Sequence, residues 1–373
     1  MEKDTENKIK DGLKQAAKDA GLAKGQDVSQ EKEIRDRLMA AKLPQKRSMY
    51  NMLIAMKKPE LEDVCYNLDI CGISRLTKAE IAKKIVPKAI DFFRRMLPSV
   101  VTEQYQALKY IYDHDGITSD INQRDFRLDT LHMTGILGTC TLDGKLAWYM
   151  PDEVMKEWKR IDSDALRRAA DLNDEMVRLA TGLVFYFGWM NFDNLYKKVS
   201  SYLEKDDEIS FMDFVGVMYN AASWRREICA RPDGLYYYTV LDPAALANKQ
   251  ADSGLKYADI SYSDAYDAGE SGYIESTNAY KKLAQYLMTE LNLDVLKAAN
   301  IVGEINILMQ NEGSLRSAAE FLEKIGAFGS MEKVKALMPL LMEYHNTSRL
   351  WYLRGHKPIR LHDRKYYRRA LKH

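Results

Sequence analysis

The stretch GISRLTKAEIAKKI, residues 72–85, contains the clearest local folding signal in the 373-residue chain. Thr77 stands where a side chain can cap a helix, and Glu80 follows three residues later, as a reciprocal capping box requires. Leu76 before the cap and Ile81 at the fourth helical position form the matching hydrophobic staple. The stretch therefore predicts a helix that begins after Thr77.

A second helix is expected just before this one. Pro59 suits a first helical turn, where its missing N–H costs nothing. Between Leu61 and Leu68, apolar residues repeat at three- and four-residue spacing and make one buried face. Gly72 can adopt the left-handed backbone conformation that redirects the chain. Residues 50–97 are thus predicted to form two helices joined by an extended loop.

The pattern KKPELEDVCYNLDICGISRLTKAEIAKKI (57–85) resembles the SAP and Rho N-terminal families of small helix–loop–helix modules. The matching residues are Leu61, Leu68, Ile70, Gly72, Ser74, Leu76, Thr77, Lys78, Glu80 and Ile81. The resemblance implies nucleic-acid binding through the loop and the start of the second helix. In this chain that region comprises Gly72, Ser74, Arg75, Thr77 and Lys78, with Lys83 and Lys84 beside them. A helix N-terminus offers N–H groups and a positive dipole end to a phosphate; alternatively, the lysines form only the solvated side of the helix.

The charge distribution adds a second basic region. The formal net charge of the whole chain is +1, which gives no global case for nucleic acid. Residues 344–373, however, contain nine Lys or Arg side chains and one acidic side chain. Such a basic end can follow an anionic partner, although it can also be a solvated tail. The candidate phosphate ligands in this region are Arg360, Arg364, Lys365, Arg368 and Arg369.

Residues 98–160 and 161–245 repeat one order of elements, in which helices are followed by two strand-like runs. Asp143-Gly144 lies between the first two runs and Asp233-Gly234 between the second two, and each pair predicts a tight hairpin turn. Helices followed by a hairpin is the order of a winged-helix domain. We therefore expect a mainly α fold with tandem winged-helix-like units, small β-hairpins and further helical modules.

The helix before the first hairpin would read DNA in a DNA-binding winged-helix domain. It carries Arg124 and Arg127, but also Asp125 and Asp129, and acidic side chains oppose the approach of phosphates. For this unit, packing against a protein is the favoured interpretation and DNA reading the alternative.

The remaining segments complete the expected organisation. Residues 1–49 are predicted to form a polar helical arm, 246–275 an acidic linker or long loop, and 276–373 a helical C-terminal domain with a basic tail. The phrase HNTSRLWYLRGHKP (345–358) is similar to a segment of bacterial SEC-C-motif-associated proteins. Residues 173–204 resemble the same group loosely. The cysteine-rich zinc motif of that group does not follow here, so the resemblance implies no metal site.

We find no grouping of residues that predicts catalysis. The four cysteines are scattered without a CxxC pair, and the six histidines show no metal-ligand spacing. The longest apolar run, Leu179–Met190, is 12 residues, too short to span a bilayer, and the charged N-terminus does not suit a signal peptide. We therefore expect a cytoplasmic protein without enzymatic activity, cofactor, metal or membrane partner. It would bind the backbone of DNA or RNA; the alternative is a protein–protein interaction adaptor.

Overall fold

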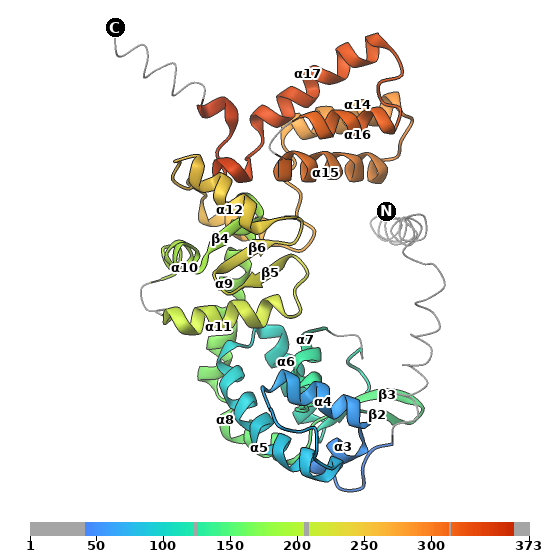
Figure 1. The fold of residues 1–373 in the computed structure, drawn as a ribbon, viewed down its shortest axis with the longest axis vertical. Helices are drawn as coiled ribbons and strands as arrows, with labels where there is room; N and C mark the ends of the chain where they lie inside the picture. Colours follow the sequence, from blue (N-terminus) through green and yellow to red (C-terminus); the bar gives the residue numbers. More distant parts are fainter. Residues whose placement is uncertain (1–41, 123–125, 205–208, 313–314, 362–373) are drawn as a thin grey trace. The chain divides into compact units, whose positions relative to one another are not determined.

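The computed structural model describes residues 42–122, 126–204, 209–312 and 315–361 (Figure 1). The fold is mainly helical and contains two small three-stranded antiparallel sheets. The chain divides into two compact units, and the boundary falls within the long helix α9 (Asp164–Phe187). The first unit comprises the described residues of 42–176 and 209–225. The second comprises those of 177–204 and 226–361.

The first unit is built from helices around one three-stranded sheet. Besides the first half of α9, its elements are α3 (Met49–Ala55), α4 (Lys58–Asn67), α5 (Lys78–Met96), η1 (Leu97–Ser99), α6 (Thr102–Asp113), β1 (Ile117–Thr118), α7 (Phe126–Met133), β2 (Gly138–Leu142), β3 (Lys145–Tyr149), α8 (Asp152–Ile161) and α11 (Phe211–Ala222). One continuous apolar cluster runs from α3 to the start of α9. Its largest fully buried side chains include Trp148, Trp158 and Phe93.

Helices α4 and α5 form the pair that the sequence predicts. α4 ends where Asp69 takes a left-handed conformation (φ 52°) and the N–H of Ile70 donates to the carbonyl of Cys65 at 2.8 Å. Gly72 is also left-handed (φ 73°), and it turns the loop toward Thr77, the N-cap of α5. The helix end therefore depends on Asp69, whose side chain type tolerates this conformation, and the direction of the loop depends on Gly72.

The first sheet has the strand order β1-β3-β2. Its β2–β3 hairpin pairs Cys140 with Ala147 and Leu142 with Lys145. The turn between them is Asp143-Gly144, as the sequence predicts, and both residues have positive φ (48° and 74°), as a type I′ turn requires.

Helix α11 packs on η1 and α6 within the first unit. The side-chain amide of Asn220 donates to the carbonyl of Ser99 at 2.8 Å and to the side-chain carbonyl of Gln104 at 2.7 Å. The hydroxyls of Thr130 and Ser223 are 3.1 Å apart. From sequence order we grouped this helix with the rest of 161–245. In the structure these polar contacts join it to residues that precede it by 93 to 121 positions in the chain.

The second unit combines a three-stranded sheet with a group of helices. Besides the second half of α9, its elements are β4 (Trp189–Asn191), α10 (Phe192–Ser200), β5 (Ile228–Arg231), β6 (Gly234–Tyr237), α12 (Pro243–Asp252), α13 (Tyr262–Ala268), α14 (Asn278–Glu290), α15 (Val295–Glu312), α16 (Arg316–Lys324), α17 (Met331–Thr347) and η2 (Trp351–Leu353). The sheet order is β4-β6-β5, which repeats the arrangement of the first sheet. Helices α14 to α17 enclose their own apolar core.

The second hairpin differs from the sequence prediction in its turn. Arg231 pairs with Gly234, so the two turn residues are Pro232 and Asp233, and Gly234 already belongs to β6. A Cβ atom at Gly234 would lie 2.2 Å from the carbonyl oxygen of Met190 in β4. Glycine is therefore required here because two backbones approach closely.

Residues 246–275, expected as a linker, contain most of α12 and all of α13. The Asp242 carboxylate accepts the N–H of Ala245 at 2.9 Å, and Pro243 occupies the first helical position. The Ser261 hydroxyl accepts the N–H of Asp264 at 3.1 Å. Both helices thus begin at N-caps, and side chains of this kind hold short helices in place.

Candidate nucleic-acid interface

Residues 72–78 bring several predicted phosphate ligands together at the start of α5. Gly72, Ser74 and Arg75 are exposed, while Lys78 is half-buried. A Cβ at Gly72 would have no neighbour within 4 Å, so glycine is needed here for the left-handed turn of the backbone and not because another group approaches closely. The loop therefore presents Arg75 and Lys78 beside a helix N-terminus.

The capping box closes part of that N-terminus. The Glu80 carboxylate accepts both the N–H and the hydroxyl of Thr77, each at 2.8 Å, and the Thr77 hydroxyl accepts the N–H of Glu80 at 3.3 Å. These bonds to Thr77 lower the pKa of Glu80. The Thr77 hydroxyl is thus engaged within the cap. The N–H groups of Lys78 and Ala79, at the first two helical positions, remain as donors without an intrahelical acceptor.

Further along α5, Lys84, Lys88 and Arg95 lie on one side of the helix. Their spacings of four and seven residues are those of neighbours on a helical surface, and the row spans roughly 16 Å at 1.5 Å per residue. All three side chains are exposed. Lys83 is exposed on the other flank of Glu80. In the described parts of the chain, none of these four cations forms an ion pair.

Two carboxylates at helical spacing from these lysines have other partners. Glu80 stands four residues before Lys84, but its carboxylate is bound to Thr77. Asp91 stands three residues after Lys88, but its carboxylate accepts from Arg94 at 3.2 Å. Lys84 and Lys88 are therefore left as a like-charged pair.

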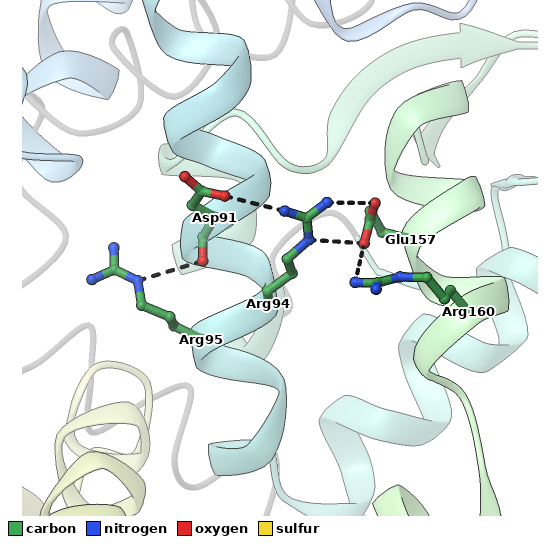
Figure 2. A network of polar contacts seen from close by, with 5 residues as sticks. All are labelled: Asp91, Arg94, Arg95, Glu157 and Arg160. Atoms are coloured by element: carbon green, nitrogen blue, oxygen red, sulfur yellow. Dashed lines mark hydrogen bonds and ion pairs between the residues drawn. The ribbon is translucent and has the colours of Figure 1, made fainter.

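Figure 2 shows how Arg94 is engaged. Its guanidinium holds Glu157 of α8 with two bonds of 2.9 and 2.7 Å, and Arg160 donates to the same carboxylate at 2.9 Å. These cations lower the pKa of Glu157 to about 2, Arg94 contributing most. Arg95 donates through Nε to the backbone carbonyl of Asp91 at 3.4 Å (Figure 2). Arg94 is thus a structural contact between α5 and α8, and the guanidinium end of Arg95 is available to a ligand.

The C-terminal candidates belong to another part of the chain. Arg360 is exposed and belongs to the second unit, whereas α5 belongs to the first. Arg364, Lys365, Arg368 and Arg369 lie outside the described residues.

Helix α7 holds the position of a reading helix before the first hairpin. Its Arg127 forms an ion pair with Glu103 of α6. Arg124 and Asp125 lie outside the described residues. Arg127 is thus paired with a carboxylate of its own unit.

A groove in the first unit was not predicted from the sequence. It has a volume of about 810 Å³ and lies among α3, α4, α7 and the sheet. Tyr66 and Met133 in its lining are 84% and 52% exposed, large values for such apolar side chains. Asn67 ties the two walls together by donating to the carbonyl of Met133 at 3.1 Å. The floor includes Gly138, where a Cβ would meet the Tyr149 ring at 2.3 Å.

Neither the site nor the rest of the described chain shows a metal centre or a membrane span. No group of three or more His, Cys, Asp or Glu side chains within the described ranges could hold a metal ion. Among the same residues, no helix combines the length and apolar character needed to cross a bilayer.

Comparison with known proteins adds no assignment to this geometry. No protein-family model matches the chain, and no curated protein and no solved structure matches it either.

Proposed function

We propose that the protein binds the phosphate backbone of DNA or RNA, without catalysis, along the start and one exposed side of α5. The observation that carries this proposal is the pair Lys84 and Lys88, whose neighbouring carboxylates Glu80 and Asp91 are bound elsewhere. A phosphate backbone would neutralise two cations that the fold leaves unneutralised.

The start of α5 would hold one phosphate. The N–H groups of Lys78 and Ala79 are free of intrahelical bonds, and the helix dipole favours an anion at this end. Arg75 and the Lys78 ammonium add charge beside them. The contacts involve backbone phosphates and offer no base-reading arrangement, so binding is expected to be insensitive to sequence.

The two sheet-containing regions would act as supports. Their order of helices, central third strand and hairpin suits winged-helix-like folds. We assign the first region a packing role because Arg127 of α7 pairs with Glu103. Arg360 and the basic residues that follow it would contact further phosphates.

The test compares two double charge reversals in the full chain. Lys84→Glu with Lys88→Glu removes the proposed contacts, whereas Lys281→Glu with Lys335→Glu makes the same change of net charge at exposed positions of the second unit. Fluorescence anisotropy with labelled single- and double-stranded DNA and RNA measures affinity between 50 and 200 mM salt. The first variant is expected to bind more weakly and to lose about 1.4 to 1.8 from the log–log salt slope, since each of the two phosphate contacts contributes about 0.7–0.9.

An equal loss of nucleic-acid affinity in both double variants would mean that only the net charge of the protein matters, and this would contradict a site on α5. Binding that does not respond to salt would contradict backbone recognition altogether.

The groove beside Tyr66 supports a second candidate function, a protein-interaction adaptor. An exposed ring and an exposed methionine at the rim of an 810 Å³ groove suit an apolar partner segment. In the same experiment, Tyr66→Ala is expected to leave nucleic-acid affinity unchanged. If the adaptor function holds instead, Tyr66→Ala abolishes capture of a protein partner from nuclease-treated extract, and the α5 variant does not.

A further inference from the structure

The second unit contains a small aromatic pocket that the proposed function does not use. It has a volume of about 170 Å³ and lies among the end of α9, β6, and helices α14, α15 and α17. Six of the aromatic side chains that line it are Tyr186, Tyr237, Tyr273, Tyr280, Tyr344 and Trp351. This volume admits a head group and excludes an extended ligand, since sites for larger molecules measure roughly 300–1,000 Å³.

The rings of the pocket hold one another in place. Phe185 stands edge-on to Tyr186, Tyr237 and Tyr273, with centroid separations of 5.1, 5.5 and 5.3 Å. The hydroxyls of Tyr186 and Tyr273 are 3.4 Å apart, and Tyr237 packs against Trp351 at 6.4 Å between centroids. A ligand would therefore find the walls already arranged, which reduces the entropy lost on binding.

Glu275 supplies the carboxylate of the lining. Within the described structure its side chain accepts no hydrogen bond and forms no ion pair. Burial raises the pKa of Glu275, while Lys357 and Arg349 act in the opposite direction. A carboxylate that is largely removed from water without a direct partner is costly, and a cation in the pocket would offset that cost.

Arg349 also lines the pocket, and its guanidinium is engaged by groups other than Glu275. It donates to the carbonyl of Gly355 at 3.2 Å and lies 5.3 Å from the ring centre of Tyr186. This contact shows that one ring of the pocket already accepts a cation on its face. Arg349 does not approach Glu275 closely enough to form an ion pair.

We propose that this pocket binds the methylated ammonium group of an organic cation, with Glu275 supplying charge and the tyrosines supplying ring faces. Aromatic faces attract cations through the ring quadrupole, and the attraction grows when the site is desolvated. A bare ammonium would need several acceptors to replace its water. Among the polar side chains of the lining, Thr277, Gln310 and Ser348 already form hydrogen bonds within the fold, so Glu275 and the eight aromatic rings are the main groups left for a cation. A methylated ammonium has few or no N–H groups to satisfy, so it fits the lining better.

Calorimetric titration of the full chain with tetramethylammonium chloride tests the proposal. The neutral analogue tert-butanol is expected to bind at least about tenfold more weakly, and Glu275→Gln to lower tetramethylammonium affinity about tenfold. Asp267→Asn is the matched control, because this exposed carboxylate in α13 lies outside the lining. Absence of tetramethylammonium binding, equal binding of tert-butanol, or unchanged affinity in Glu275→Gln would overturn the proposal.

A second variant covers a folding failure of Glu275→Gln. Tyr273→Leu removes a half-buried ring from the wall and is expected to weaken tetramethylammonium binding while tert-butanol binding changes little. If its tetramethylammonium affinity equals that of the wild type, the rings do not form the site. Competition by a trimethyllysine peptide, but not by the same peptide with unmodified lysine, would assign the cation to a protein side chain. Failure of the methylated peptide to compete would assign it to a free quaternary amine.

Discussion

Replacing Glu157 by glutamine should destabilise the first unit in a manner that depends on pH. Glu157 joins α8 to α5 through two bonds from Arg94 and one from Arg160 (Figure 2). These cations hold its pKa at about 2, below the ordinary value of 4.5. The depressed pKa stabilises the fold above pH 4.5, and this contribution is lost as the pH falls from 4.5 through about 2.

The magnitude follows from the shift and from the exposure of the partners. A shift of this size corresponds to at most about 3 kcal/mol, at 1.36 kcal/mol per pKa unit. The Glu157 side chain is 14% exposed, but Arg94 and Arg160 are 42% and 64% exposed, so solvent screens the interaction. We therefore expect Glu157→Gln to lower the free energy of unfolding by about 1–2 kcal/mol at pH 7.

Urea denaturation of wild type and Glu157→Gln at pH 7, 4 and 2.5, with hydrogen exchange of α5 and α8 peptides, measures the difference. It should shrink steadily below pH 4.5 and approach zero near pH 2. Glu62→Gln is the matched control, because Glu62 is an exposed carboxylate of the same unit, and its effect should stay within about 0.5 kcal/mol at every pH. A difference that is independent of pH would refute the role of the Glu157 charge.

Two further pairs of substitutions test the folding argument. Thr77→Ala removes the N-cap of α5 and should lower the free energy of unfolding of the first unit by about 1 kcal/mol. Thr77→Ser keeps a capping hydroxyl and should retain most of that stability. Urea unfolding midpoints measure the difference, and equal midpoints for the two variants would contradict the role of the cap. Gly234→Ala places a Cβ 2.2 Å from the Met190 carbonyl oxygen and should lower the stability of the second unit by about 2–3 kcal/mol. Gly303 lies in a helix without a neighbour within 4 Å, so Gly303→Ala should stabilise that unit by about 0.5–1 kcal/mol. Thermal unfolding midpoints that move in the same direction for both variants would contradict this expectation.

The features that sequence predicts well are local. The Thr77–Glu80 capping box and the Asp143-Gly144 turn each depend on residues within four positions, and both form as the residue types indicate. The second turn shows the limit of such rules. Asp233-Gly234 is the same pair of residues, yet Gly234 already belongs to the strand. It must be glycine because β4 passes too close for any side chain. That requirement comes from Met190, far away along the chain.

The same limit applies to the candidate site. Sequence identified Arg75, Lys78, Lys83 and Lys84 as cations near a helix start, and the structure places them there. Sequence could not show that Arg94 is engaged, because its partner Glu157 lies 63 residues away. The tyrosine pocket is harder still, since its lining is drawn from segments between residues 185 and 351. Spacing on the helix surface, in contrast, could have identified Lys88 and Arg95 as neighbours of Lys84.

The distribution of ion pairs on α5 argues that its basic side has a role beyond folding. Elsewhere, helical neighbours pair opposite charges, as Lys109 does with Asp113 and Arg316 with Glu320. On α5 the fold instead directs the nearby carboxylates to the cap and to Arg94, and leaves Lys84 beside Lys88. Like charges at this spacing cost a few tenths of a kcal/mol and contribute nothing to packing. A bound phosphate would replace this repulsion by attraction between the phosphate and both lysines. Charge reversal of Lys84 and Lys88 is therefore the most direct test of function.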